Sequence, residues 1–593
     1  MKGTFARGIK AGSLAVAALC MMAAFGEAQA QGAPSQSAVV NLIRLLVKQK
    51  VITQQAADAL LKEAESEAVQ ARHAKVATEV VPAPVPVPEA RPEPPPPAAG
   101  TVRVPYVPQI VRNQIRDEVK AEVLKEAKAE NWAQPETLPA WTRRFKLSGD
   151  FRFRDESDFY GRNNIGSDGV DGFINYAAFN ANGPTDVNPN NILNTIPFLD
   201  TTGNRYNLLS LRARLGIAAH VTDDVLVNVR LATGNDNSPV STTQLLGGGL
   251  GKKNVWLDQA YVALTPIPDA TVTLGRMPNP FFHTDLVWDE NLNFDGVDAG
   301  AESKIPWVQN VGLFGNAGVF PIGYINSNFP THSPVKSTDH TEMLLGAQIG
   351  ADWKQSRYDW RFAVSWYDYL NSQGALSSPC PVYLASNASS VQCSSDDTVP
   401  AFMQKGNTLF LIRNIIPDPS NPTNYAQPQF AGLAFKYNEL DATSRFDVRM
   451  AHDYHVVLDA DFVRNLAYNP STAFRYAPFG SFPITNFDPS SRSIQSGPNA
   501  WMARVLFGDP EIHSRWDWNI SAGYKYIQPD AVLDAFDDHD FHMGGTNAKG
   551  YVLKASLGIF DNTWLQARWF SANEVYGPPL AIDVAQLDLN TAF

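Results

Sequence analysis

The chain has 593 residues, a formal net charge of −12 and only 18% charged residues. This length suits several soluble domains or one large barrel with an extension. The acidic balance argues against nucleic acid as a partner. The mean hydropathy of −0.21 argues against a helical membrane protein, and the one long apolar run lies at the amino terminus.

Residues 1–30 have the three parts of a secretory signal peptide. A basic region contains Lys2 and Lys10, residues 11–25 are apolar, and residues 28–30 (Ala-Gln-Ala) form a small-x-small cleavage site. We therefore predict that the protein is exported and cleaved after residue 30.

Residues 31–135 precede any strand pattern and are expected to form an extension in the periplasm. Residues 31–79 read as a helical segment, either an aid to assembly or an anchor for a periplasmic or cell-wall partner. Residues 80–108 are a proline-rich linker, which favours extended polyproline II at about 3.1 Å per residue. Residues 109–135 predict an amphipathic helix that docks on the barrel or bundles three subunits.

From residue 141 to residue 593 the hydrophobic period changes from 3.6 to 2, which is typical of strands. In one such strand, apolar residues alternate with Ser210, Arg212 and Arg214. We count sixteen such segments and predict an all-β transmembrane barrel of about 16 antiparallel strands. The weakest segments are 293–303 and 428–440, so 14 or 18 strands stay open.

Connections between the predicted strands alternate between short and long. Short ones, such as 221–224 and 561–562, alternate with long ones, such as 157–204, 370–427 and 528–548. Short periplasmic turns and long extracellular loops are the pattern of outer-membrane barrels, and tryptophans near strand ends suit the aromatic girdles of such barrels.

The last strand ends on an aromatic residue. Leu587, Leu589 and Phe593 share one face, and Asp588 and Asn590 share the other. We expect this strand to close the barrel, with its apolar face toward lipid. A terminal Phe593 also resembles the signal that the barrel-assembly machinery reads.

Several motifs resemble the family known as putative porins of Gram-negative bacteria. They are Asn-Leu-Ile-Arg-Leu-Leu-Val at 41–47, Val-Pro-Tyr-Val-Pro at 104–108, Arg-Asn-Gln-Ile at 112–115, Leu-Ser-Gly-Asp-Phe-Arg-Phe-Arg at 147–154, Leu-Gly-Arg-Met-Pro-Asn-Pro at 274–280 and Asp-Leu-Val-Trp-Asp at 285–289. The resemblance spans nearly the whole exported chain. It implies a pore-forming outer-membrane barrel, with no defined substrate and no catalytic residues.

Charged residues at inward-facing strand positions are the candidate pore lining. A predicted basic wall comprises Arg152, Arg154, Arg212, Arg214, Arg230 and Arg568, and an opposing acidic lumen comprises Asp352, Asp459 and Asp461. Opposed charges across a narrow pore would tune ion preference. The alternative is that these charges pair and only hold the wall rigid.

The third long loop, 278–292, is the candidate constriction. It carries Asp285, Asp289 and Glu290 together with aromatic residues that could pack it inside the barrel. The alternative is a loop that lies on the extracellular rim. In the loop 370–427, Cys380 and Cys393 are expected to form a disulfide, because the exported compartment is oxidising.

No enzymatic motif, cofactor motif or metal-ligand spacing stands out, so we expect no catalytic residues, no cofactor and no metal. Residues 534–540, with His539 and His542, could suggest a metal site, but we expect a solvated extracellular loop there.

The sequence thus predicts an outer-membrane porin for passive diffusion of small hydrophilic solutes and ions. The alternative is a structural or tethering protein with an occluded barrel. Expected partners are outer-membrane lipids and lipopolysaccharide, the barrel-assembly machinery and two further copies in a homotrimer, but no nucleic acid.

Overall fold

The structure of the protein is a computed structural model. It describes residues 144–165, 172–182, 185–186, 198–305, 308–324, 341–379, 395–414, 416, 418–420, 428–473, 485–488 and 490–593. The predicted signal peptide, helices and proline-rich linker lie outside the described residues, and so do both cysteines of the expected disulfide. None of the described helices is long and apolar enough to cross a bilayer.

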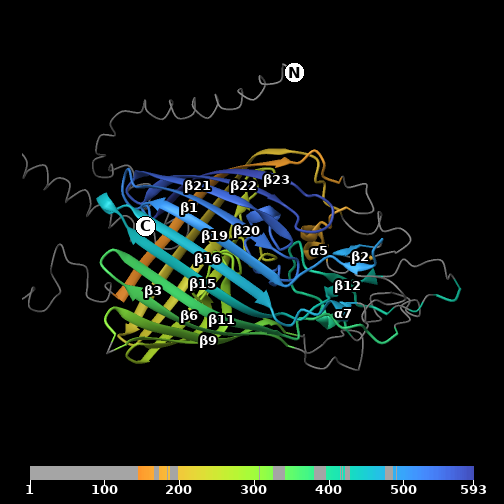
Figure 1. Ribbon diagram of the computed structural model, residues 1–593, viewed down its shortest axis with the longest axis horizontal. Coiled ribbons are helices and arrows are strands. Elements are labelled where there is room, and N and C mark those ends of the chain that lie inside the picture. The colour runs from red at the N-terminus through yellow and green to blue at the C-terminus, as the bar shows by residue number, and fades with distance from the viewer. Residues whose placement is uncertain are drawn as a thin grey trace, which may run out of the picture. The chain divides into compact units, whose positions relative to one another are not determined.

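Sixteen long strands of the described chain form one closed antiparallel barrel, as the sequence predicts (Figure 1). The strands are β1 (Phe145–Tyr160), β3 (Arg205–Thr222), β4 (Val225–Thr233), β6 (Val255–Ile267), β7 (Ala270–Pro278), β8 (Asn293–Lys304), β9 (Val311–Gly323), β10 (Glu342–Lys354), β11 (Tyr358–Leu370), β15 (Asn438–Arg449), β16 (His455–Asn465), β19 (Asn499–Gly508), β20 (Trp518–Ile527), β21 (Ala548–Phe560), β22 (Thr563–Asn573) and β23 (Ile582–Ala592). A two-residue strand, β5 (Gln244–Leu245), pairs with the edge of β3.

The barrel closes between its first and last strands. β1 pairs antiparallel with β23 from Asp150 opposite Ala592 to Tyr160 opposite Ile582. Phe593 continues the pairing, because its N–H donates to the Gly149 carbonyl and its own carbonyl accepts from Gly149, both at 3.0 Å. The ring of Phe593 is exposed on the outer surface. Closure satisfies every strand edge, which a bilayer requires.

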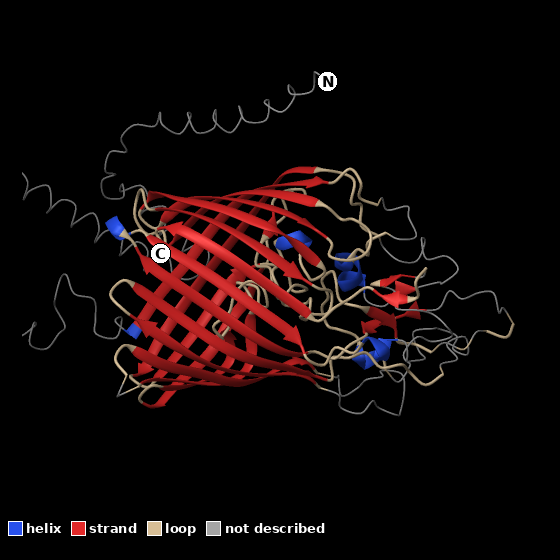
Figure 2. Cartoon of the chain, viewed as in Figure 1, coloured by secondary structure: helices blue, strands red, loops and turns tan. Residues whose placement is uncertain are grey.

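The two ends of the barrel differ in their connections (Figure 2). Short turns, such as residues 223–224 and 561–562, lie at one end, at the left of the view. Long segments, such as 279–292 and 528–547, connect the strands at the other end. The predicted alternation of short turns and long loops is present, so the long loops are on the extracellular side of an outer-membrane barrel.

Small elements lie in the long loops of the described chain. They are α5 (Tyr176–Asn182), β2 (Thr185–Asp186), η5 (Asp396–Thr398), β12 (Leu409–Leu411), β13 (Pro428–Gln429), β14 (Ala431–Leu433), α7 (Pro470–Ala473), β17 (Phe487–Asp488), β18 (Ser493–Ile494) and η8 (Phe541–Met543). One further short element, η6 (Ala451–Asp453), connects β15 to β16.

The predicted strand 428–440 is wrong, because the barrel strand there is β15, which begins ten residues later. The apolar residues that suggested a strand pack instead in the extracellular loops, where Phe435 is fully buried with Phe410 and Ile412. The part of this segment that precedes β15 has strand-like alternation, but it packs in the core of the extracellular loops. Strand β20 begins only at Trp518, because Trp516 has a φ of 78° and ends a turn.

Side chains alternate between the two faces of the wall. Exposed outward residues include Leu215, Ile217 and Leu553, while inward neighbours such as Arg214 and Ser556 are polar. Outward aromatic rings also gather near strand ends: Phe159 stacks with Trp569 at 6.0 Å and meets Tyr206 edge-on at 5.7 Å. This is the surface of a barrel that has lipid outside and polar groups inside.

Candidate functional site: the lumen and its inserted loops

The loop of residues 279–292, between β7 and β8, folds into the barrel. Phe281 and Trp288 are buried, and both rings meet Tyr367 of β11 edge-on, at 5.2 and 5.1 Å. Phe281 also packs against Phe320 of β9. These partners are inward-facing residues of the wall strands that follow β8, so apolar contact holds this loop inside the barrel rather than on its rim.

Ionic contacts anchor the same loop to a different part of the wall. The Asp285 carboxylate lies 3.0 Å from Arg504 of β19 and 2.8 Å from Lys525 of β20. Burial raises the pKa of Asp285, but these two cations outweigh burial and hold the pKa well below its usual range. The loop therefore spans the lumen, from strands β7 and β8 to strands β19 and β20.

A second loop, residues 528–547 between β20 and β21, also enters the barrel. Asp534, Asp537 and His542 are buried, so the expectation of a solvated extracellular loop over residues 534–540 is wrong. Cations of the wall pair with Asp538 and Asp540 of this loop, and these ion pairs explain why the loop is buried inside the barrel. Asp538 lies 2.6 Å from Lys525, and Asp540 lies 2.9 Å from both Arg154 and Arg568.

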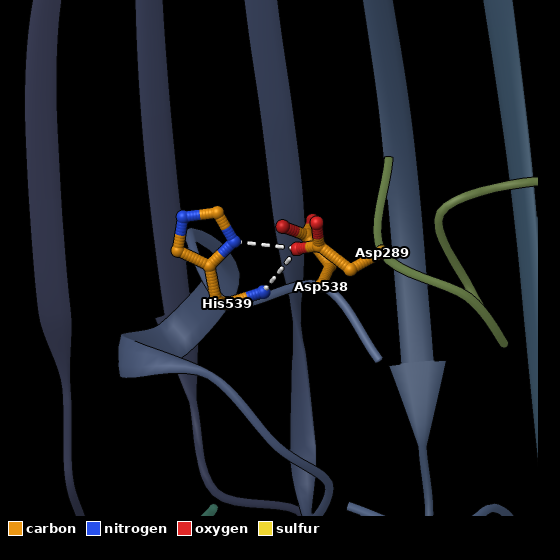
Figure 3. A group of neighbouring side chains, drawn as sticks. All are labelled: Asp289, Asp538 and His539. Carbon is orange, nitrogen blue, oxygen red and sulfur yellow. Dashed lines mark hydrogen bonds and ion pairs between the residues drawn. The ribbon is translucent and has the colours of Figure 1, made fainter. Parts of the chain in front are cut away.

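The two inserted loops meet at Asp289, Asp538 and His539 (Figure 3). The ring Nδ1 of His539 lies 2.5 Å from an Asp289 oxygen, and the His539 backbone N–H donates to the same oxygen at 3.1 Å. Burial lowers the pKa of His539, but Asp289 and Asp540 outweigh burial and raise it to about 10. His539 is therefore a cation at neutral pH, and the group is an ion-pair network between the loops.

The six arginines of the predicted basic wall have different partners. Arg154 pairs with Asp588 and Asp540, and Arg568 pairs with the same two carboxylates. The remaining contacts are Arg212 and Arg214 to Asp150, Arg230 to Asp258, and Arg152 to the Thr243 hydroxyl. Most of these arginines are thus neutralised by residues on neighbouring strands or loops.

The three predicted acidic residues also have partners. Asp352 lies 3.6 Å from Arg361, and Asp459 lies within 2.9 Å of both Arg445 and Arg504. Asp461 accepts a hydrogen bond from Thr284 of the loop 279–292. These carboxylates hold the wall and the inserted loop together, and cations lie beside two of them.

Glu290 differs from the other charged residues of the inserted loop. Its side chain is 65% exposed, although it lies in a loop that the barrel encloses. Its nearest cation is Arg212, at 3.7 Å from one carboxylate oxygen. Water therefore reaches a carboxylate that faces the β1 and β3 side of the lumen.

Sequence analysis missed much of this site. Asp150, Arg504, Lys525 and Lys554 occupy inward positions that strand parity could have identified. The carboxylates Asp538 and Asp540 gave no signal of insertion, because loops have no hydrophobic period. Glu439 and Asp441 of β15 were missed because the predicted strand was misplaced.

Extracellular segments pack over these loops and form a polar core of their own. Asn407 donates to the carbonyls of Pro529 and Val532, while Asp530 accepts from Thr408 and Tyr437. Lys405 pairs with Glu574 at 2.9 Å. The described loops of this end are therefore fixed to one another.

A closed sixteen-stranded antiparallel barrel with a loop inserted in its lumen defines the porin class of outer-membrane proteins. The chain belongs to the family described as "Putative porin", whose profile matches residues 36–593. No curated protein matches it. The protein is therefore an outer-membrane porin, with the fold of a channel rather than of an enzyme.

The chain is also similar to solved porin structures, and each match covers 76% of this chain. One is OprB of Pseudomonas putida at high pH, with 11% identity, a TM-score of 0.38 and 94% of that chain covered. Two others are the outer membrane channel DcaP of Acinetobacter baumannii (10%, 0.34, 97%) and Salmonella typhi OmpF with daunomycin (10%, 0.35, 97%).

Proposed function

We propose that the protein is a porin for passive diffusion of small hydrophilic solutes and ions. The observation that carries this proposal is the exposure of charged side chains inside the barrel. Glu290 on the inserted loop is 65% exposed and Arg445 of β15 is 52% exposed, although both face the lumen. A lumen in which such groups remain hydrated can conduct ions.

The proposed constriction lies between the loop 279–292 and the wall formed by β1 and β3. Asp285 and Asp289 hold the loop in place, while Glu290 faces the arginines of that wall. Opposite charges across this gap produce a transverse field, which rings of lumenal charge use to tune permeation. Arg152, Arg212 and Arg214 supply the positive side of this field, whereas Arg154, Arg230 and Arg568 have close carboxylate partners.

Single-channel conductance of the exported protein in a planar bilayer tests this function. We expect stepwise openings, with a reversal potential under a salt gradient that changes when Arg212 and Arg214 become glutamine. Openings with an unchanged reversal potential in these variants would support the porin function but contradict the proposed pore lining. No openings from folded, heat-modifiable protein would contradict the diffusion proposal.

The second candidate is a structural protein with an occluded barrel, and one observation favours it. Trp288 and Phe541 of the inserted loops are fully buried, together with Tyr367 of the wall and Tyr437 just before β15. On this proposal residues 31–140 form a periplasmic tether. Cross-linking from this segment should then capture cell wall or a periplasmic protein, whereas conductance should be absent.

We propose a homotrimer from the pattern of outward rings. In the described chain, no exposed aromatic residue lies between Trp256 and Tyr324, although exposed rings are frequent from Trp353 onward. A face without an aromatic girdle suits a second copy better than a lipid interface. The detergent-corrected mass by light scattering tests this proposal, and a monomeric mass would contradict it.

Three further proposals concern the surroundings. Outer-membrane lipids and lipopolysaccharide would contact the girdled face, and the barrel-assembly machinery would read the strand that ends at Phe593. The extension would lie in the periplasm, where the short turns are. Protease added outside intact cells should then leave residues 31–140 uncut, and cleavage there would contradict this location.

A further inference from the structure

We propose that the constriction binds small organic carboxylates, and that Glu290 holds the place of the solute carboxylate when the pore is empty. The proposal rests on the porin function and names its solute class. It depends on a local surplus of cations on the β1, β3 and β21 side of the lumen.

The adjoining part of the wall, at β15, β19 and β20, has no such surplus. There Arg445, Arg504 and Lys525 meet Asp285, Asp459 and Asp538 in one network with equal numbers of cations and carboxylates. Closely paired charges satisfy one another and leave little affinity for a passing ion. A charged solute is therefore not expected to bind at that side.

Three cations on the β1 and β3 side, Arg152, Arg212 and Arg214, outnumber their close carboxylate partners, whereas Arg154 is paired with Asp540 and Asp588. Arg212 and Arg214 share the single carboxylate of Asp150, at 3.1 and 2.6 Å. Behind them Arg152 is buried, and its Nη2 donates to the Thr243 hydroxyl at 2.6 Å, while its Nε has no hydrogen-bond partner among the described residues. In the described part of the chain Arg152 has no carboxylate within ion-pair distance, and Asp540 and Asp588 act on it only from farther away, so it adds positive potential to this wall.

Lys554 of β21 adds a second cation without a carboxylate. It is half-buried and faces inward, beside Arg568 in the register of β21 and β22. Within the described residues no hydrogen bond or ion pair of its ammonium group is found. Glu290 is its strongest electrostatic partner, and Glu290 also acts on Arg152 and Arg212.

Glu290 thus has one ion-pair contact, with Arg212, while Lys554 and Arg152 act on it from farther away, and the structure holds it weakly. Its contact with Arg212 is 3.7 Å, longer than a charge-assisted hydrogen bond of about 2.8 Å. Its neighbour Asp289, in contrast, is buried and tightly bound to His539. Asp289 fixes the backbone at this point, whereas the exposed Glu290 side chain has only one long ion pair, so a solute carboxylate can displace it.

The geometry selects carboxylates over neutral solutes. A guanidinium presents its donors in a planar fork that matches a carboxylate, and Lys554 supplies a point charge. A neutral amide of the same shape gains neither interaction and cannot displace Glu290. Halide ions are attracted by the same potential, but they lack the two oxygens that Arg212 can bind together.

The experiment measures current block in reconstituted, full-length exported protein by succinate, by its half-amide succinamate and by neutral succinamide. We expect block in the order succinate, succinamate, succinamide. Lys554→Gln should weaken succinate block roughly tenfold, the effect of losing one charge-assisted contact. Glu290→Gln should strengthen it about threefold to tenfold, because the competing carboxylate is gone.

Lys304→Gln is the matched control, since Lys304 is an exposed lysine at the short-turn end of β8. It should leave succinate block unchanged. Equal block by succinate and succinamide, or weaker block in Glu290→Gln, would overturn the proposal while chloride conductance still showed a porin. Absence of any conductance would instead refute the porin function. Because Glu290→Gln predicts a gain, misfolding cannot imitate it.

Discussion

Asp289 and His539 lie 250 residues apart, yet one carboxylate oxygen accepts both the backbone N–H and the ring Nδ1–H of His539. This contact joins the loop after β7 to the loop after β20 inside the barrel. Ion pairs attach both loops to the barrel wall, so a substitution at the contact between Asp289 and His539 should change the shape of the lumen.

The first prediction concerns pH. The pKa of His539 is raised to about 10, so its ion pair contributes fully below the ordinary value of about 6.5 and is lost as the pH rises through 10. Between pH 8 and pH 11 we therefore expect noisier current and larger conductance. His539→Gln should show this behaviour already at pH 8. An identical pH response in wild type and variant would refute the assignment.

The second prediction concerns the aromatic anchor. Trp288→Ala removes a fully buried ring that contacts Tyr367 and Phe294, which costs about 3–5 kcal/mol in a packed core. The loop should detach, so conductance should rise and the urea midpoint should fall. Leu250→Ala, in a loop position that is almost fully exposed, should change neither.

The third prediction tests the close approach of loop and wall. A Cβ at Gly346 of β10 would lie 2.5 Å from the Phe281 ring, so Gly346→Ala should push Phe281 away from the wall, toward the lumen axis, and lower the conductance. Gly312→Ala is the control, because its Cβ would meet atoms only at 3.9 Å or beyond. Equal conductance of the two variants would show that Phe281 does not set the pore width.

The fourth prediction concerns the ionic anchor. Asp285→Asn removes the carboxylate shared by Arg504 and Lys525, and breaking a buried ion pair costs roughly 3–5 kcal/mol. Arg504 and Lys525 would keep Asp459 and Asp538, but the network would gain one net positive charge and shift the reversal potential toward anions. Asp295→Asn makes the same charge change on an exposed residue paired with Arg276, and should leave the reversal potential as in wild type.

The fold was largely predictable because a strand of period 2 reports its two faces directly. Arg152 and Arg154 could be assigned to the inside from their apolar neighbours alone. The exception, β15, failed because residues 428–437 alternate like a strand while they pack in a loop core. Local pattern does not tell which partner buries an apolar face.

The site was less predictable, for a different physical reason. Arg154 is paired with Asp540, which lies 386 residues later in a loop without periodicity. Strand parity predicts that Arg154 faces inward, but it does not predict that a loop carboxylate lies beside it. Charge compensation between loops and wall depends on tertiary placement. The sequence therefore predicted a basic wall and an acidic lumen, but not which of their charged groups lack a close partner of opposite charge.

The pairing of β1 with β23 has a consequence for biogenesis. Residues at the two extremes of the barrel sequence must be present together before either obtains its full set of backbone hydrogen bonds. A chain truncated before residue 582 would expose two open strand edges, on β1 and β22, and such edges recruit other chains. Completeness of synthesis is thereby built into assembly: only a finished polypeptide can protect its own seam.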